Sequence, residues 1–283
     1  MDEDLAEWQE RQNEQRRFRE AEVTNDHSVI SALITGDDEN TKCYLVDNPN
    51  LTDSEVWALA HDRAVPVRIE LAKSKQVTSN AILKLTHDKS DIVRVYALCH
   101  PLTDDSYLAE SIMHDKFSVT AKKLFCESFR VLGSLEIFRF LWTTVKGGPA
   151  ILMDTLVGET YQTVPVIDPQ VRLFVHDEIL NGNVSNAVRE TYAGSAGVAL
   201  PEILDRLKDD SHRPVINAIA RNSAAWVSTH DYLASNHKTS DIRTSIAMVT
   251  QDNALLNKIY KGTKSKDIRF WVEQNPVFVL MPD

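Results

Sequence analysis

The sequence predicts an all-α fold: a right-handed α-solenoid built from two-helix repeats of about 26 residues. Three short phrases recur together at this spacing: a threonine, a His-Asp pair and a valine that is usually followed by arginine. The positions are Thr52, Thr78 and Thr103; His61, His87 and His114, each followed by Asp; and Val67, Val93 and Val119. Such a period indicates repeats that bury their apolar faces only against neighbouring repeats. It favours an extended surface over a cleft enzyme.

The composition is that of an ordinary soluble protein. Of 283 residues, 43% are hydrophobic and 25% are charged. No apolar run approaches the roughly 18 residues of a membrane span, and the start, Met1-Asp2-Glu3-Asp4, has no apolar segment of the kind found in secretory signals. The three cysteines form no C-x-x-C pair. We therefore expect a cytoplasmic protein.

The net charge of −10 is distributed unevenly. Residues 1–40 contain 12 acidic and 4 basic residues, whereas residues 41–124 contain 11 of each. Residues 186–283 contain 11 acidic and 12 basic residues. The predicted repeats are therefore nearly neutral, and most of the negative charge belongs to the N-terminal segment.

Residues 1–27 are predicted to form an acidic helical arm. Glu, Gln and Arg dominate residues 1–24, and Gly and Pro are missing from them. Leu5 and Trp8 are three residues apart and therefore share a helix face. Two interpretations remain open: a solvated end helix, or an arm that docks on a partner or on its own array.

Residues 28–124 are predicted to form a first repeat array. Each repeat has a first helix, such as 53–61 or 79–87, preceded by a Thr in the N-cap position. A second helix follows at 65–73 or 91–99. Apolar residues fall on one side of each first helix, for example Val56, Leu59 and Ala60.

Residues 186–283 are predicted to form a second array, because the period returns at Val188, Val215, Ile242 and Ile268. A turn follows each of these positions by seven or eight residues. The turn positions include Asn222-Ser223 and Asn275-Pro276, and the latter echoes Asn48-Pro49.

The intervening residues 125–185 do not keep the period. They are predicted to be a degenerate repeat with an insertion that either kinks the array or carries a binding loop.

The repeat resembles the variant leucine-rich repeat, a family similar in style to HEAT repeats. The resemblance is carried by Asn-Pro-Asn-Leu-Thr at 48–52, Leu-Ala-His-Asp at 59–62 and Val-x-Val-Arg-x-x-x-Ala at 65–72. It is strongest over residues 41–124 and 186–276. It implies short helix pairs stacked into a curved solenoid, and it implies no common chemistry. The family's founding members carry a cysteine cluster for an iron–sulfur centre, which this sequence lacks, so we expect no cofactor.

His-Asp occurs five times, at His61, His87, His114, His176 and His230. Such pairs could suggest a metal-dependent phosphohydrolase. Three of them keep the repeat register, however, and stacked repeats hold them roughly 10 Å apart, too far to share one ion. A histidine in the last turn of a helix also interacts favourably with the helix dipole, and the aspartate can cap the next helix. We expect structural capping and no metal.

Five arginines form a ladder in the same register: Arg68, Arg94, Arg189, Arg243 and Arg269. A basic ladder could bind a phosphate backbone. Carboxylates lie close by in sequence, at Asp62, Asp91, Asp241 and Asp267. Half-buried arginine–carboxylate pairs that tie one repeat to the next are therefore the favoured interpretation.

The best candidates for partner contact lie where the period fails or ends. They are Trp8 in the arm, Phe138 and Trp142 in the irregular segment, and Trp271 with Lys258, Lys261, Lys264 and Lys266 near the C-terminus. Lysines interleaved with aromatics suit an acidic partner or nucleic acid. The acidic arm, either of the same chain or of a second copy, is a further possible occupant of the basic end.

The sequence favours a non-catalytic scaffold, adaptor or inhibitor that binds another protein. The alternative is a HEAT-like nucleic-acid-binding protein that uses the basic C-terminal patch and the arginine ladder. A third possibility is an enzyme whose site uses Asp168, His176 or Asp177 in the irregular segment. Motifs for phosphate-binding loops and for a nucleophilic serine are missing, so we expect no catalytic residues.

Overall fold

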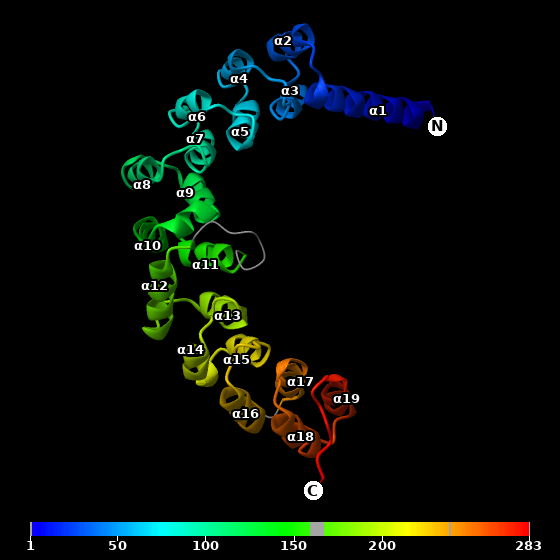
Figure 1. Cartoon of the computed structure of the whole chain (residues 1–283), viewed down its shortest axis with the longest axis vertical. Coiled ribbons are helices and arrows are strands. Elements are labelled where there is room, and N and C mark those ends of the chain that lie inside the picture. The colour runs from blue at the N-terminus through cyan, green and yellow to red at the C-terminus, as the bar shows by residue number, and fades with distance from the viewer. Residues whose placement is uncertain (1, 159–166, 238, 283) are drawn as a thin grey trace. The chain divides into compact units, whose positions relative to one another are not determined.

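The computed structural model describes residues 2–158, 167–237 and 239–282. Throughout these residues the secondary structure is helical, with no β-strand (Figure 1). The predicted all-α fold is confirmed, and neighbouring helices pack in sequence as they do in a solenoid. Within the described ranges, no helix combines the length and the apolar character needed to cross a membrane.

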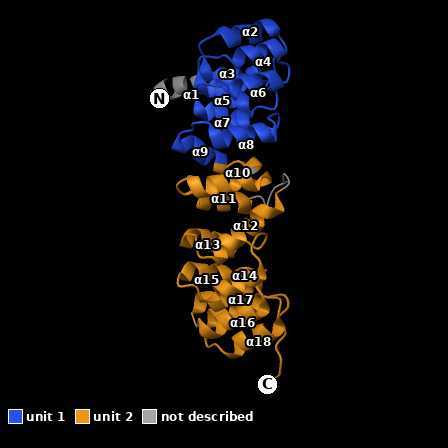
Figure 2. Cartoon of the chain, turned by 90° about the vertical axis from the view of Figure 1, so that its left-hand side faces the viewer, with its two compact units in different colours: residues 1–125 blue, residues 126–283 orange. Residues whose placement is uncertain are grey.

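The chain divides into two compact units, residues 1–125 and residues 126–283 (Figure 2). This division falls where the predicted irregular segment begins. Each unit consists of two layers of helices: a first layer made of the first helix of each repeat, and a second layer made of the second helix (Figure 1).

Unit 1 is formed by even-numbered helices in the first layer and odd-numbered helices in the second. The first layer contains α2 (His27–Thr35), α4 (Asp53–Leu59), α6 (Ser79–Leu85) and α8 (Asp105–His114). The second layer contains α1 (Asp2–Val23), α3 (Glu39–Leu45), α5 (Val65–Lys73), α7 (Asp91–Leu98) and α9 (Val119–Cys126), which ends at the division.

Unit 2 repeats this alternation after a short 3₁₀ helix, η1 (Phe129–Gly133). Its first layer contains α10 (Leu135–Thr144), α12 (Pro169–Leu180), α14 (Pro201–Arg206), α16 (Val227–Asn236) and α18 (Asn253–Lys261). A second 3₁₀ helix, η3 (Leu207–Asp209), follows α14. The second layer contains α11 (Gly148–Gly158), α13 (Asn186–Gly194), α15 (Arg213–Ala220), α17 (Ser240–Val249) and α19 (Lys266–Gln274).

The predicted N-caps are present. Thr52 accepts a hydrogen bond from the Glu55 amide, while the Glu55 carboxylate accepts one from the Thr52 amide, which makes a capping box at the start of α4. Thr78 accepts from the Ala81 amide at the start of α6. These helices are only 7 residues long, too short to be stable alone, so burial between the layers must stabilise them.

The end of α1 is part of the packed helices. Ala21 in the last turn of α1 is buried, and the Phe18 ring stacks on Tyr44 of α3 with centroids 4.4 Å apart. The end of α1 therefore occupies the second-layer position before α3. The predicted boundary at residue 27 stays a prediction, and the structure adds that the end of α1 packs on α3.

The irregular segment 125–185 keeps the two-layer alternation in its described part, since α11 packs on α13 as α13 packs on α15. The turn between α10 and α11 requires glycine. Gly147 has φ of 81°, and a Cβ on Gly148 would come within 2.6 Å of the Leu141 carbonyl oxygen. Part of the predicted insertion, residues 159–166, lies outside the described residues.

Buried side-chain amides connect successive helices of the second layer. The Asn222 Nδ2 donates to the Ala193 carbonyl oxygen at 2.7 Å, and its Oδ1 accepts from the Ala224 amide. Asn48 and Asn275 make the same bonds to the ends of α1 and α17. Each amide thereby satisfies carbonyl groups that a helix end leaves without a partner.

We predict that Asn222→Ala destabilises the protein by about 1–3 kcal/mol, because it leaves the buried Ala193 carbonyl without a donor. The exposed neighbour Ser223 provides the matched control, and Ser223→Ala should change the stability by less than about 0.5 kcal/mol. Chemical denaturation followed by circular dichroism measures both. Equal midpoints for the two variants would contradict this role for the amide.

Candidate functional site

Buried ion pairs tie consecutive repeats of unit 1 together. Lys42 Nζ lies 2.7 Å from an Asp62 carboxylate oxygen, and both side chains are almost fully buried. One repeat later, Arg68 Nε lies 2.7 Å from an Asp88 carboxylate oxygen. In each case the cation comes from a second-layer helix, and the aspartate follows the first-layer helix of the next repeat.

The aspartate of each pair has two roles. While one oxygen of Asp88 contacts Arg68 Nε, the other accepts the Ser90 amide at 2.8 Å and fixes the turn into α7. Asp62 likewise accepts the Ala64 amide at 2.7 Å. The predicted capping by these aspartates is wrong in detail: the N-caps of α5 and α7 are Ala64 and Ser90, and each aspartate instead fixes the turn just before its helix.

The charged pairs shift the acidities of their carboxyls. Burial alone raises the pKa of Asp88, but hydrogen bonds from Arg68 and the Ser90 amide outweigh it and hold the pKa below its usual value. The same balance of causes lowers the pKa of Asp210, which receives Arg189. Both carboxylates are therefore ionised at neutral pH.

In unit 2 the arginine ladder is only partly paired with carboxylates. Arg189 Nε lies 2.7 Å from an Asp210 oxygen. The other two arginines donate to main-chain oxygens, Arg243 to Ala234 at 3.0 Å and Arg269 to Thr263 at 3.1 Å.

The predicted pairing of arginines with carboxylates of the next repeat thus holds for Arg68 and Arg189. Three of the aspartates inferred from sequence proximity have partners other than the predicted arginine, so these predicted pairs are wrong. Asp62 pairs with Lys42, Asp91 accepts the Ser118 amide, and Asp241 pairs with Arg213.

The histidines of the His-Asp pairs serve the helix ends. The Nδ1 of His61 lies 2.9 Å from the Trp57 carbonyl oxygen, and that of His87 lies 3.0 Å from the Leu83 carbonyl oxygen. These contacts agree with the predicted structural role. In the described ranges, no three His, Cys, Asp or Glu side chains are grouped so that they could hold a metal ion.

The two His-Asp histidines of unit 2, His176 and His230, are buried. His176 packs edge-on against Tyr192 and lies 3.4 Å from the Val198 carbonyl oxygen, and His230 lies 3.3 Å from that of Ile219. Burial lowers the pKa of both imidazoles, so they are neutral at physiological pH.

The residues considered for an enzyme site have the following places in the described structure. Asp168 is the N-cap of α12 and accepts amides from Gln170 and Leu135, at 2.9 Å and 3.3 Å. Asp177 is exposed, whereas its neighbour His176 is buried. Burial also raises the pKa of Cys43 to about 11 and that of Cys126 to about 12, so neither thiol is activated as a nucleophile.

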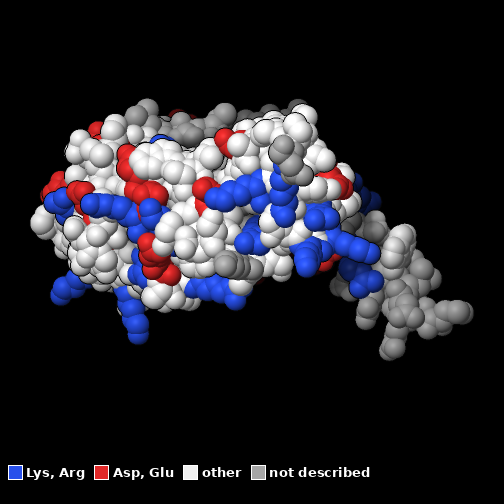
Figure 3. Space-filling view, turned by 90° about the horizontal axis from the view of Figure 1, so that it is seen from below, with Lys and Arg blue, Asp and Glu red and all other residues white. Residues whose placement is uncertain are grey.

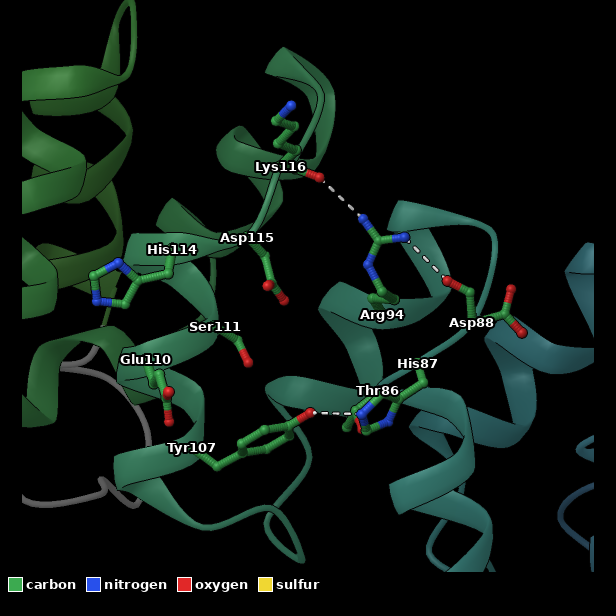
Figure 4. A pocket seen from close by; sticks show the side chains of 10 residues that line it. All are labelled: Thr86, His87, Asp88, Arg94, Tyr107, Glu110, Ser111, His114, Asp115 and Lys116. Carbon is green, nitrogen blue, oxygen red and sulfur yellow. Dashed lines mark hydrogen bonds between the residues drawn. The ribbon is translucent and has the colours of Figure 1, made fainter.

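The pairing pattern changes at the third repeat of unit 1. Arg94 occupies the register of Lys42 and Arg68, and the matching aspartate is Asp115. However, the Arg94 guanidinium donates to the main-chain oxygens of Asp88 and Lys116, at 3.0 Å and 3.1 Å (Figure 4). It also lies 4.9 Å from the centre of the Phe117 ring.

Helix length explains the change. Helix α8 has 10 residues, whereas α4 and α6 have 7. In the second repeat, His87 and Asp88 follow the end of α6, but His114 is still the last residue of α8. Asp115 becomes the C-cap, with extended backbone (φ −78°, ψ 153°). The longer helix thus places the Lys116 carbonyl, rather than the Asp115 carboxylate, opposite Arg94.

A polar pocket of about 430 Å³ opens at this position. It lies between α8 on one side and the end of α6 with the start of α7 on the other (Figure 4). Its lining residues are Thr86, His87, Asp88, Arg94, Tyr107, Glu110, Ser111, His114, Asp115 and Lys116. The Tyr107 hydroxyl lies 3.2 Å from His87 Nε2 across the pocket floor.

Three lining groups are available to a ligand. In the described part of the chain, no hydrogen bond or ion pair reaches the side chains of Glu110, Ser111 or Asp115. Ser111 is 5% exposed, and its hydroxyl points into the pocket (Figure 4). Sequence reasoning missed this site, although the 27-residue step from His87 to His114 was a signal of the extra residue.

Two of the predicted partner-contacting aromatics are in the core of unit 2. Phe138 is 0% and Trp142 is 5% exposed, and both rings pack against Phe174. The prediction that they contact a partner is corrected: they face inward and stabilise the packing of α10 on α12. The strongly apolar stretch around them indicates a buried helix.

The other two predicted aromatics are on the surface. Trp8 on α1 is 54% exposed, and Trp271 on α19 is 38% exposed. Phe270, next to Trp271, is 52% exposed, and the two rings meet edge to face with centroids 5.4 Å apart.

The four predicted lysines are all exposed, but they differ in their contacts. Lys258 forms an ion pair with Asp231, and Lys261 donates to the Pro282 carbonyl oxygen at 3.3 Å. For Lys264 and Lys266, the described residues provide no ion-pair or hydrogen-bond partner. Lys and Arg side chains cover part of the face shown in Figure 3. We define the C-terminal surface as Lys264, Lys266, Phe270 and Trp271.

The residues after α19 are held by side-chain amides of α18. Asn257 donates to the Val279 carbonyl oxygen at 2.9 Å and accepts the Met281 amide at 2.8 Å. Asn253 accepts the Val279 amide at 2.8 Å. These bonds contact only the backbone of the tail, whose side chains Val279 and Leu280 are 67% and 57% exposed.

Comparison with known proteins assigns the chain to no family. No protein-family model, no curated protein and no solved structure matches the chain. The class that the structure itself defines is a two-layer helical-repeat protein. The resemblance to variant leucine-rich repeats remains a prediction from the sequence.

The contrast between Asp88 and Asp115 yields a stability prediction. Asp88→Asn should destabilise the protein by about 3 kcal/mol, because it leaves the buried Arg68 without its carboxylate. Asp115→Asn should change stability by less than about 0.5 kcal/mol, because the carboxylate has no partner to lose. Urea denaturation measures both. A large cost for Asp115→Asn would mean that Arg94 pairs with Asp115 in solution.

The lowered pKa values of Asp88 and Asp210 predict an acid-sensitive stability. A carboxyl with a folded pKa below the unfolded value stabilises the protein above the unfolded pKa, and this stability is lost as pH falls through the folded pKa. The unfolding free energy should therefore begin to drop below about pH 5 and keep dropping as the pH falls below the ordinary aspartate pKa of 3.8. The drop should be smaller in Asp88→Asn. Identical pH profiles for the two proteins would contradict the assignment.

Proposed function

We propose that the chain is a non-catalytic repeat scaffold that binds another protein through its C-terminal surface. The observation that carries the proposal is the exposed pair Phe270 and Trp271 on α19. Aromatic side chains of this kind dominate the binding energy of protein interfaces, where burial removes a large apolar area at low entropic cost.

Helix geometry explains why these rings face outward. Ile268 and Val272 on α19 are buried against the packed helices, and they fix the orientation of the helix. Phe270 falls on the side opposite to them, and Trp271 falls on the flank of the buried face. Core packing therefore does not require these two rings, and the helix presents them on a rigid support.

Charge indicates the kind of partner. Lys266 lies one helical turn before Phe270 on α19, Lys264 lies just before that helix, and the described residues provide no partner for either ammonium group. A partner segment with acidic residues around an apolar anchor would complement this surface.

Nucleic-acid binding is the second candidate, and the exposed lysines favour it. Two of them, however, are already engaged by Asp231 and Pro282. Two free lysines would release few counterions, and affinity would then fall with salt with a logarithmic slope of only about −2. Stable backbone binders use roughly 6–10 phosphate contacts. Protein binding is the better-supported proposal.

A photo-crosslinking amino acid at position 271 tests the proposal in native cell extract. The same amino acid at Trp57, an exposed tryptophan of α4 that is 45% accessible, is the matched control. We expect a protein adduct from position 271 that persists after nuclease treatment and is missing from position 57. Loss of the adduct on nuclease treatment would favour nucleic acid, and no adduct would contradict the proposed surface.

With the cross-linked partner in hand, Trp271→Ala should weaken binding at least about 30-fold, which corresponds to about 2 kcal/mol. Trp57→Ala should leave the affinity unchanged. Titration calorimetry measures both. An unchanged affinity in Trp271→Ala would show that the partner docks elsewhere.

The acidic N-terminal segment of a second copy of the chain is the remaining candidate occupant of the C-terminal surface, because that surface carries two lysines. Removal of residues 1–14 tests it while leaving Phe18 and Ala21, which pack on the array, in place. Light scattering should show a lower particle mass after the truncation if the arm joins two copies. An unchanged mass excludes the arm as the intermolecular occupant.

A further inference from the structure

Three other repeats have an aspartate at the position that corresponds to Asp115, and in each of them this aspartate forms an ion pair. Asp62, Asp88 and Asp210 each receive a cationic side chain with a nitrogen–oxygen distance of 2.7 Å. The cation always comes from the second-layer helix of the preceding repeat, 20 or 21 residues earlier. This position is therefore built to accept an ammonium or guanidinium group.

At Asp115 the cation is missing. The two terminal nitrogens of Arg94 donate to the main-chain oxygens of Asp88 and Lys116, and its guanidinium lies over the Phe117 ring, so these nitrogens are not available to the carboxylate (Figure 4). The Lys116 ammonium also points away from Asp115 in this view. The carboxylate instead faces the pocket.

The pocket supplies the other contacts that a cation needs. The Ser111 hydroxyl is part of a side chain that is 5% exposed, points into the pocket and has no bonding partner in the described ranges. This hydroxyl lines the open pocket, where its oxygen can accept a hydrogen bond from a ligand. Glu110 adds a second carboxylate at the rim. In the described ranges, the free groups of the pocket include the oxygens of Glu110, Ser111 and Asp115 and the ammonium group of Lys116.

We propose that this pocket binds a lysine or arginine side chain of the partner protein, which completes the third rung of the ladder from outside. The Asp115 carboxylate pairs with the incoming cation, and the Ser111 oxygen accepts one of its hydrogen bonds. The inference deepens the proposed function, because it names a basic residue of the partner. It rests on the proposed function, because the cation would come from the proposed partner. The experiment that tests cation binding by the pocket does not require that partner.

The test titrates the full chain with N-acetyl-arginine amide and follows the backbone amides by NMR. We expect saturable shifts centred on Ser111 and Asp115 at millimolar ligand. The neutral isostere N-acetyl-citrulline amide should give none. Lysine amide in a separate titration shows which of the two cations the pocket prefers. Shifts of equal size with citrulline amide, or no saturable shift with either cation, would overturn the proposal.

Two variants assign the contacts. Asp115→Asn should raise the dissociation constant at least about tenfold, and Ser111→Ala should raise it by a smaller factor. The control is Asp47→Asn, which removes an exposed carboxylate outside the pocket and should leave binding unchanged. Unfolding midpoints confirm that each variant is folded. Equal binding by Asp115→Asn and the parent protein would overturn the assignment, as would shifts of the same amides with inorganic phosphate in place of the cation.

The outcomes separate this site from the proposed function. Trp271→Ala should bind arginine amide as the parent protein does, because the pocket lies entirely within unit 1. Arginine binding without a cross-linked partner at position 271 would support the pocket and reject the C-terminal surface. A cross-linked partner without arginine binding would do the reverse.

Discussion

The repeats depend on an aspartate whose carboxylate serves two elements at once. It accepts the amide that fixes the turn between the two helices of its own repeat, and it receives a cation from the preceding repeat. Local folding and stacking are therefore coupled in one side chain. Because each pair joins only neighbours, the array gains stability by adding repeats and not by enlarging a single core. The candidate pocket arises where this coupling is relaxed, at Asp115.

Much of the fold could be predicted from the sequence. The spacing of Thr52, Thr78 and the His-Asp pairs gave the helix starts and ends, because caps require particular side chains at fixed distances from a helix terminus. The position of α1 could not be read in this way. Its packing rests on Ala21 and on the contact of Phe18 with Tyr44, which carry no periodic signal in such a polar helix.

The candidate sites were harder to predict, for two physical reasons. Apolar content does not distinguish a core from an interface, so Phe138 and Trp142 resembled a contact surface although they pack inside unit 2. A pocket formed by a longer α8 depends on which of two groups Arg94 meets. That choice follows from a shift of a few ångströms, which residue types alone do not encode.

The tail after α19 has a consequence for how its sequence can vary. Asn253 and Asn257 bind its main chain, while Val279 and Leu280 project into solvent. A main-chain clamp of this kind recognises length and extended conformation but not side-chain identity. Most substitutions at residues 279 and 280 should therefore preserve the tail contact. A proline at 279 or 281 would disrupt it because proline has no amide donor, and a one-residue deletion would disrupt it because it shifts the register.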